Sequence, residues 1–190
     1  MSAFPTSPRP RTVQIASTAP SLMSEAPSGR QQVRTRGGQR WILTLNYPPR
    51  LRAELDPVFA AAAALQGRFN TCTVTPGYYH KDARGTATSG TASAGVAGAF
   101  TVSLSSLNGT LKAGDFLKFA AHSKVYIVTA DKAAGAGALS ISPALIQDVG
   151  SEALTLQDVP FTCRLAGDVA TYGTGLAGIN GLTVQLAEAY

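Results

Sequence analysis

A regular series of short apolar segments in the second half of the chain constrains the fold more than any other feature. Five segments with alternating apolar residues follow one another at intervals of about 8 to 12 residues, separated by turn-forming residues. They are FTVSLSSL (100–107), GDFLKFA (114–120), KVYIVTAD (124–131), GALSISPAL (137–145) and EALTLQD (152–158). Neighbouring side chains of a strand point to opposite faces. The pattern therefore predicts a small all-β barrel, OB-like or SH3-like.

The segment LKAGDFLKFAAHSKVYIVTAD (111–131) holds most of the charged side chains of this predicted barrel. Their spacing follows strand alternation, so we expect them to solvate the outside of the barrel and not to form a site. They are Asp115, Lys118, His122, Lys124 and Asp131. Asp115 follows Gly114, where an aspartate favours closure of a β-turn.

The N-terminal region predicts an arm followed by strands. Residues 1–10 contain three prolines and favour an extended, mobile arm. RTVQIAST (11–18) is a strand candidate, and APSLMSEAPSGR (19–30) is expected as a loop. RQQVRTRGGQRWILTLNY (30–47) predicts a hairpin, because Gly37-Gly38 can adopt the positive φ values of a tight turn. Its apolar residues at alternate positions are Trp41, Leu43 and Leu45.

The segment LRAELDPVFAAAAALQGR (51–68) predicts a helix. Pro48-Pro49 precedes it and blocks a helical approach. Asp56-Pro57 is a possible start, since proline fits the first turn, and Gly67 is a possible C-cap. The apolar residues expected near one helical face are Leu51, Leu55, Val58, Phe59 and Leu65.

A change of composition divides the chain. Residues 77–100 are rich in Gly, Ala, Ser and Thr, which indicates a linker with one thin strand in it. The strand FNTCTV precedes this stretch, and the similar strand FTCRL follows the predicted barrel. The pattern favours one domain, residues 11–78 plus 159–190, split by an inserted linker and barrel at 79–158. Two tandem domains are the alternative.

Positive charge is concentrated near the N-terminus. Residues 1–52 contain eight arginines and one acid, Glu25, hence a net charge of +7, whereas the remainder has eight basic and ten acidic residues, hence −2. Arginine forms forked pairs with carboxylates or phosphates and gives up its hydration more easily than lysine. We expect an interface with an acidic protein rim or with nucleic acid, the alternative being a solvated strand face. The candidates lie on the predicted hairpin: Arg30, Arg34, Arg36 and Arg40.

The sequence offers no set of residues suited to catalysis. Its serines occur in no GxSxG elbow, its Gly-rich stretch lacks the end of a P-loop, and its acids are scattered. We expect His80 and His122 to be exposed turn residues, and Cys72 and Cys163 to be buried thiols that could be neighbours in one sheet. The prediction is a protein that is not an enzyme, with no catalytic residue, no cofactor and no metal.

Neither a membrane span nor a secretory signal is predicted. No apolar run reaches the roughly 18 residues that a span requires. The first residues also lack the apolar middle of a signal peptide. We therefore expect a soluble product that is made in the cytosol.

A barrel beside an arginine-rich segment suggests one alternative function, the binding of single-stranded nucleic acid. Base stacking would need exposed aromatic platforms. Phe116, Phe119 and Tyr126 are available, but their alternation with apolar neighbours favours core positions. The predicted barrel also carries little net charge, whereas affinity for nucleic acid depends chiefly on cations near phosphates.

Several stretches carry a resemblance to a known family. RTRGGQRWILTLNYPP with its following helix and strand, LKAGDFLKFAAHSKVYIVTAD with LSISPAL, and DVPFTCRLAGD are similar to the distal tail proteins of bacteriophages with long, non-contractile tails. The resemblance covers nearly the whole chain from about Arg11. It implies a mainly β fold: a split β-sandwich or barrel belt domain with one helix, which closes into a six-membered ring at the tail tip and carries the inserted barrel.

Distal tail proteins connect the tail tube to the hub and the receptor-binding fibres, and DNA passes through the lumen of the ring. The resemblance therefore implies a virion protein whose partners are copies of itself, the tail tube protein, and the hub and fibre proteins, with no specific binding of the passing DNA. The long carbohydrate-binding insertion of some relatives is missing, so direct host recognition is not implied. The alternative is another virion structural role, as a tail-tube, tail-terminator or head-to-tail connector subunit.

Overall fold

The computed structural model describes residues 2–76, 84–169, 171–174 and 179–190. The chain divides into two compact units: the first comprises residues 1–6, 71–163 and 189–190, and the second comprises residues 7–70 and 164–188. Strands dominate the described part of the chain, which contains one helix, so the predicted mainly β fold class is confirmed.

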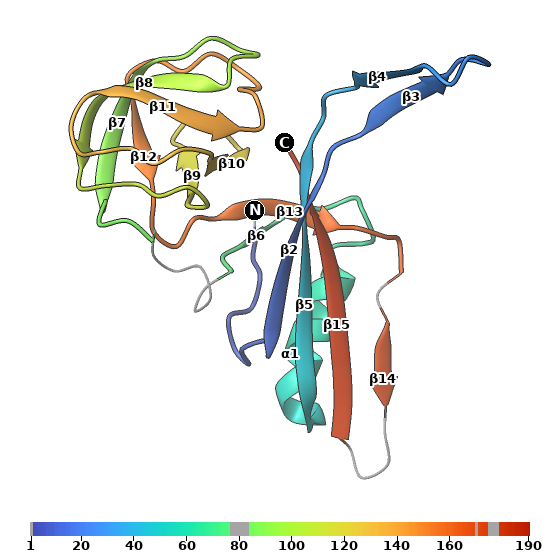
Figure 1. Ribbon diagram of the computed structural model, residues 1–190. Helices are drawn as coiled ribbons and strands as arrows, with labels where there is room; N and C mark the ends of the chain where they lie inside the picture. The colour runs from blue at the N-terminus through green and yellow to red at the C-terminus, as the bar shows by residue number, and fades with distance from the viewer. Residues whose placement is uncertain (1, 77–83, 170, 175–178) are drawn as a thin grey trace. The chain divides into compact units, whose positions relative to one another are not determined.

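A closed barrel of six strands forms most of the first unit (Figure 1). The strands are β7 (Ser89–Ala94), β8 (Thr101–Asn108), β9 (Phe116–Phe119), β10 (Val125–Val128), β11 (Gly137–Ser142) and β12 (Glu152–Thr155). They are joined in the order β10-β11-β8-β7-β12-β9, and each pair of neighbouring strands in the barrel is antiparallel. All five strands predicted after residue 100 are therefore confirmed.

The sixth barrel strand, β7, lies within the stretch predicted to be a linker. Small residues in that stretch allow close packing: a Cβ atom on Gly90 would stand 3.1 Å from methyl groups of Leu107 and of Leu154. The one thin strand predicted in this stretch is confirmed as β7, but it forms part of a tight barrel wall and not of a linker.

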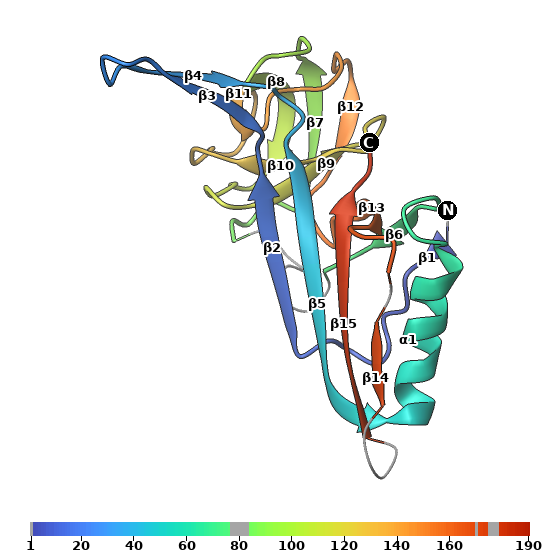
Figure 2. The same cartoon turned by 90° about the vertical axis from the view of Figure 1, so that its right-hand side faces the viewer.

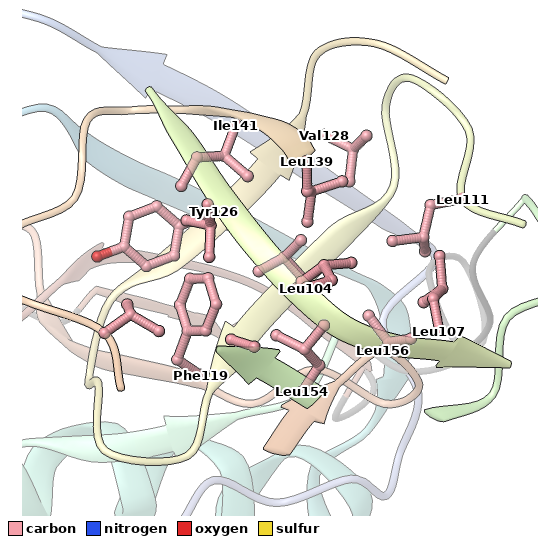
Figure 3. Packing of buried hydrophobic residues seen from close by; sticks show 14 of the residues in the cluster. Leu104, Leu107, Leu111, Phe119, Tyr126, Val128, Leu139, Ile141, Leu154 and Leu156 are labelled. Carbon is pink, nitrogen blue, oxygen red and sulfur yellow. The ribbon is translucent and has the colours of Figure 1, made fainter. Parts of the chain in front are cut away.

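Aliphatic and aromatic side chains fill the barrel interior. In Figure 3, Phe119 and Tyr126 lie among Leu104, Leu139 and Ile141, and all five are buried. Core positions for Phe119 and Tyr126 are confirmed. Phe116 lies on the other face of β9, half-buried, with its ring 5.6 Å from that of Phe161.

The first unit also contains a short strand group. In it β6 (Cys72–Val74) pairs antiparallel with β13 (Phe161–Leu165) and parallel with β1 (Ser2–Ala3). Phe4 is buried, and its N–H donates to the carbonyl of Thr73 at 2.9 Å. Residues 2–4 are extended, as predicted, but the prediction that they are unpacked is wrong, because β1 pairs with β6 and Phe4 is buried.

The two cysteines face each other in this group. Cys72 and Cys163 are register partners of β6 and β13, and both are buried thiols. Burial raises the pKa of Cys72 to about 11. Both expectations for the cysteines, burial and neighbouring positions in one sheet, are confirmed.

In the second unit, an antiparallel sheet is covered by the helix. Its strands β2 (Thr12–Thr18), β5 (Arg40–Leu51) and β15 (Ile179–Glu188) lie in that order, and β14 (Tyr172–Thr174) pairs with β15. Helix α1 (Arg52–Ala64) runs along one sheet face (Figure 2). The buried residues of β5 are Trp41, Leu43, Leu45 and Tyr47, which confirms the predicted alternation.

The helix differs from its prediction in detail. It starts at Arg52, so Pro57 lies inside it, and Leu51 precedes it with an exposed side chain. Phe59 is half-buried, and its ring stacks on Tyr172 at 4.9 Å. The C-cap is Leu65, and Gly67 has a φ of +67° two residues later. The predicted inward positions of Leu55, Val58 and Leu65 are confirmed, because all three side chains are buried.

The largest difference concerns the predicted hairpin at 30–47. Strand β4 (Gln31–Thr35) does not pair with β5; it pairs with β3 (Ser21–Glu25), which lies in the stretch predicted to be a loop. The turn is at residues 26–30, where Gly29 has a φ of +76°. Gly37-Gly38 has the expected positive φ values, but it leads the chain from β4 into β5. The predictions of a hairpin at 30–47 and of a loop at 19–30 are both wrong, because the residues that form turns do not determine which strands pair.

Candidate assembly interface

The structure places three of the four candidate arginines along one exposed element. Arg30 precedes β4, Arg34 lies within it and Arg36 follows it, whereas Arg40 begins β5. All four side chains are exposed. The contacts predicted for them with an acidic neighbour stay a prediction, since no partner chain is present.

We call strands β3 and β4 with their connecting turn, residues 21–35, the projecting ribbon. Figure 1 shows it continuing beyond the ends of β2 and β5. Each residue of β3 and of β4 is exposed, so neither face of the ribbon is covered. An isolated two-stranded hairpin is only marginally stable in water, and unpaired strand edges readily accept another chain. The ribbon therefore has the properties of a contact element.

The two faces of the ribbon differ in chemistry. Met23 lies opposite Val33 on one face, and Leu22 lies opposite Arg34 on the other. Met23, Val33 and Leu22 are 65%, 63% and 49% exposed. Met and Arg are enriched in protein interfaces, whereas Lys and Glu are depleted there. This composition is typical of a surface that contacts protein.

The second unit also contains a groove of about 320 Å³. It is bounded by the last part of α1, by the end of β13 with the segment that follows it, and by β15. Its lining includes Ala62, Leu165, Val169, Leu182 and Gln185. Val169 is 80% exposed. The neighbouring Asp168 is exposed and forms a salt bridge of 3.6 Å with Arg68. The groove thus has an exposed apolar lining residue, Val169, that directly follows a salt-bridged aspartate in the chain.

The sequence predicts that the charged side chains of residues 111–131 lie on the outside of the barrel. This prediction is wrong for three of them, because Asp115, His122 and Lys124 are buried. Asp115 accepts hydrogen bonds from the N–H groups of Arg84, Gly85 and Lys112 at 2.6, 3.3 and 2.7 Å. It closes the turn that begins at Lys112, as predicted, and it also fixes the first residues of the barrel. Strand alternation does not predict the burial of these three residues, because they lie in turns and at strand ends and not within the strands.

His122 is buried between strand ends. Its Nδ1 lies 2.9 Å from the hydroxyl of Tyr126, which accepts a hydrogen bond from the N–H of Ile146 at 3.3 Å. Burial lowers the pKa of His122, with Glu152 acting in the opposite direction. The prediction of an exposed turn histidine is wrong for His122, and His80 lies outside the described residues.

Lys124 is fully buried, with Nζ 4.4 Å from the ring centroid of Tyr190. Lys118, half-buried, donates from Nζ to the carbonyl of Pro160 at 3.2 Å. Both lysines stabilise the first unit by contacts with residues remote in sequence. No local signal marks Tyr190 as a partner of Lys124.

Two further findings concern the described residues. Within them, no group of three or more His, Cys, Asp or Glu side chains is arranged to hold a metal ion. Among the same residues, no helix has the length and apolar character needed to cross a membrane.

Comparison with protein families identifies the barrel segment. Residues 80–159 match the family model described as Distal tail protein pb9, B domain. The resemblance to bacteriophage distal tail proteins is therefore confirmed for residues 80–159. The matched segment contains all six barrel strands, and the match supports a structural role in a phage tail. No curated protein matches the chain.

Proposed function

We propose that this protein is a non-catalytic subunit of a ring at the distal end of a phage tail tube. In this proposal, residues 11–78 and 159–190 form the ring-forming belt domain, and residues 79–158 form a linker and an inserted barrel. Six copies close the ring, which connects the tube protein to the hub and to the receptor-binding fibres of a long, non-contractile tail. DNA passes through the lumen without specific binding.

The family match over residues 80–159 is the observation that carries the proposal. The projecting ribbon supports it, because a two-stranded element exposed on both faces fits a subunit that is completed by neighbours. Arg30, Arg34, Arg36 and Arg40 are proposed to contact an acidic neighbour, since arginine is suited to forked pairs with carboxylates. Two of the three aromatic residues considered for base stacking, Phe119 and Tyr126, are buried and offer no stacking platform, so they do not support nucleic-acid binding.

Electron cryo-microscopy of purified virions tests the proposal. We expect this chain in a closed ring between tube and tip, with the barrel pointing outward. Density for the chain in the tube, the terminator or the connector would keep a structural role and replace the ring proposal by that role. Absence of the chain from the particle would overturn both.

A further inference from the structure

We propose that Leu22 and Arg34 of one copy dock on the groove and on Asp168 of the next copy. The projecting ribbon would then be the contact that links neighbouring subunits. The inference rests on the proposed function, because it takes an assembly of identical chains as its setting. It adds the two surfaces that meet.

The ribbon presents an apolar side chain and a cation together. Leu22 and Arg34 are directly opposite each other in the β3–β4 register, and the Cβ atoms of such a pair are about 4.5 to 5.5 Å apart. Both side chains are exposed. This face can therefore insert an aliphatic group while it places a guanidinium at the edge of the contact.

The groove presents the complementary pair. Its volume of about 320 Å³ is ample for a leucine side chain, given that a cavity of about 150 Å³ admits benzene. Val169 forms part of its lining, and Asp168, whose carboxylate is exposed, directly precedes Val169 in the chain. A carboxylate has about four acceptor positions, so the salt bridge to Arg68 leaves room for a second arginine.

A second copy of this chain is the occupant that fits. The ribbon does not fill the groove of its own copy, because every residue of β3 and β4 is exposed. A contact between two different surfaces of the same chain is heterologous, and repetition of such a contact closes into a ring when the rotation allows. The combination of aliphatic and arginine side chains favours a protein partner over DNA.

Exchange of the two charges tests the inference. The full-length chain and the variants R34E, D168R and R34E/D168R are compared by sedimentation velocity over a range of concentrations, with circular dichroism as a check on folding. Each single variant is expected to weaken self-association about tenfold or more, because it places like charges together. The double variant is expected to recover most of the lost association. Failure of the double variant to recover would overturn the contact.

Disulfide trapping gives a second measurement that does not depend on charge. The variant L22C/V169C, treated with oxidised glutathione, is expected to yield covalently linked copies, since Cys72 and Cys163 are buried and contribute little. The matched control M23C/V169C carries its cysteine on the opposite face of the ribbon and is expected to yield few. Stronger trapping in the control would overturn the inference.

The outcomes separate this inference from the proposed function. A ring in virions without recovery by R34E/D168R and without trapping would leave the function intact and reject this contact. Wild-type chains that stay monomeric at all concentrations, together with virions that lack the chain, would reject both.

Discussion

The barrel and the projecting ribbon are both built from antiparallel strands, but they bury their side chains very differently. Within the barrel, one side of each strand faces a continuous apolar core that includes Phe119 and Tyr126 (Figure 3). In the ribbon, both sides of β3 and β4 are exposed. Closure of the barrel also leaves no free edge, whereas the ribbon has edges that other chains can join.

The difference shows which part of the chain is stable by itself and which part gains stability from contacts with other chains. A closed barrel satisfies its backbone groups and its apolar side chains internally, so its stability is a property of the single chain. The ribbon gains little from folding alone, because a two-stranded hairpin is marginal in water. Its apolar side chains become useful only in an assembly.

The substitution Phe119→Ala should have the largest effect, because it removes a fully buried ring from the barrel. We expect a loss of about 3 to 5 kcal/mol in the free energy of unfolding, measured by urea denaturation of the full chain. The isosteric change Leu117→Met is the control and should cost less than about 1.5 kcal/mol. A loss below 1 kcal/mol for Phe119→Ala would contradict a tightly packed core.

The substitution Asp115→Ala should rank second. It leaves the three N–H groups that donate to this buried carboxylate without their acceptor, and hydrogen bonds to charged groups contribute about 1.5 to 3 kcal/mol each. Because water can replace part of the loss, we expect about 3 kcal/mol by urea denaturation. Asp131→Ala is the control, since Asp131 is exposed and its loss should destabilise the chain much less than the loss of Asp115.

The contrast between the two regions also explains what the sequence could predict. The barrel strands were predictable because burial on one side produces an alternation that each segment carries by itself, as in Leu117 and Phe119 on β9. Trp41, Leu43 and Leu45 on β5 were predictable for the same reason. An exposed ribbon carries no such alternation, and the sequence therefore predicts a loop where β3 lies.

Other failures involve partners distant in the chain. Burial of Asp115 depends on the backbone at Arg84 and Gly85, and Lys124 lies under the ring of Tyr190. Gly37-Gly38 was correctly expected to have positive φ, but φ does not specify which strands follow a turn. No sequence pattern predicts the groove beside Val169, because the groove is formed where three separate segments pack together.

A double-mutant cycle with Lys124→Met and Tyr190→Ala should give a smaller effect in the same unit. A cation–π contact of a desolvated lysine contributes about 2 kcal/mol, so we expect a coupling energy of about 1 to 2 kcal/mol from urea denaturation of the two single variants and the double variant. A coupling energy near zero would show that Tyr190 does not stabilise the buried ammonium.

The stability of the barrel should also depend on pH through His122. Because burial lowers the pKa of His122 in the folded state, the unfolded chain, with a histidine pKa of about 6.5, binds more protons in weak acid. The contribution of His122 to the free energy of unfolding is therefore fully present above a pH of about 6.5, and it decreases as the pH falls below that value. Urea midpoints between pH 7.5 and 5 should decline for the wild type and decline less for His122→Gln.

Asp131 in the same barrel also has a shifted pKa, but it does not contribute to the pH dependence between pH 7.5 and 5. Hydrogen bonds from Lys112 and from the N–H of Ala113 lower the pKa of Asp131 below its usual value near 3.8, so this group titrates at lower pH. Equal pH dependence in the wild type and in His122→Gln would contradict the assignment to His122.

Substitutions in the ribbon should have the smallest effect on the free energy of unfolding, and they test the contrast with the barrel most directly. Leu22→Ser and Val33→Ser should each change the free energy of unfolding of the monomer by less than about 0.5 kcal/mol, because exposed side chains lose few contacts. The same two variants should differ in self-association, since only Leu22 lies on the face proposed to dock. Losses of 2 kcal/mol or more in dilute monomer would mean that the ribbon packs on its own chain. It would then be a structural element like the barrel, and the distinction between a self-sufficient region and an assembling region would fail.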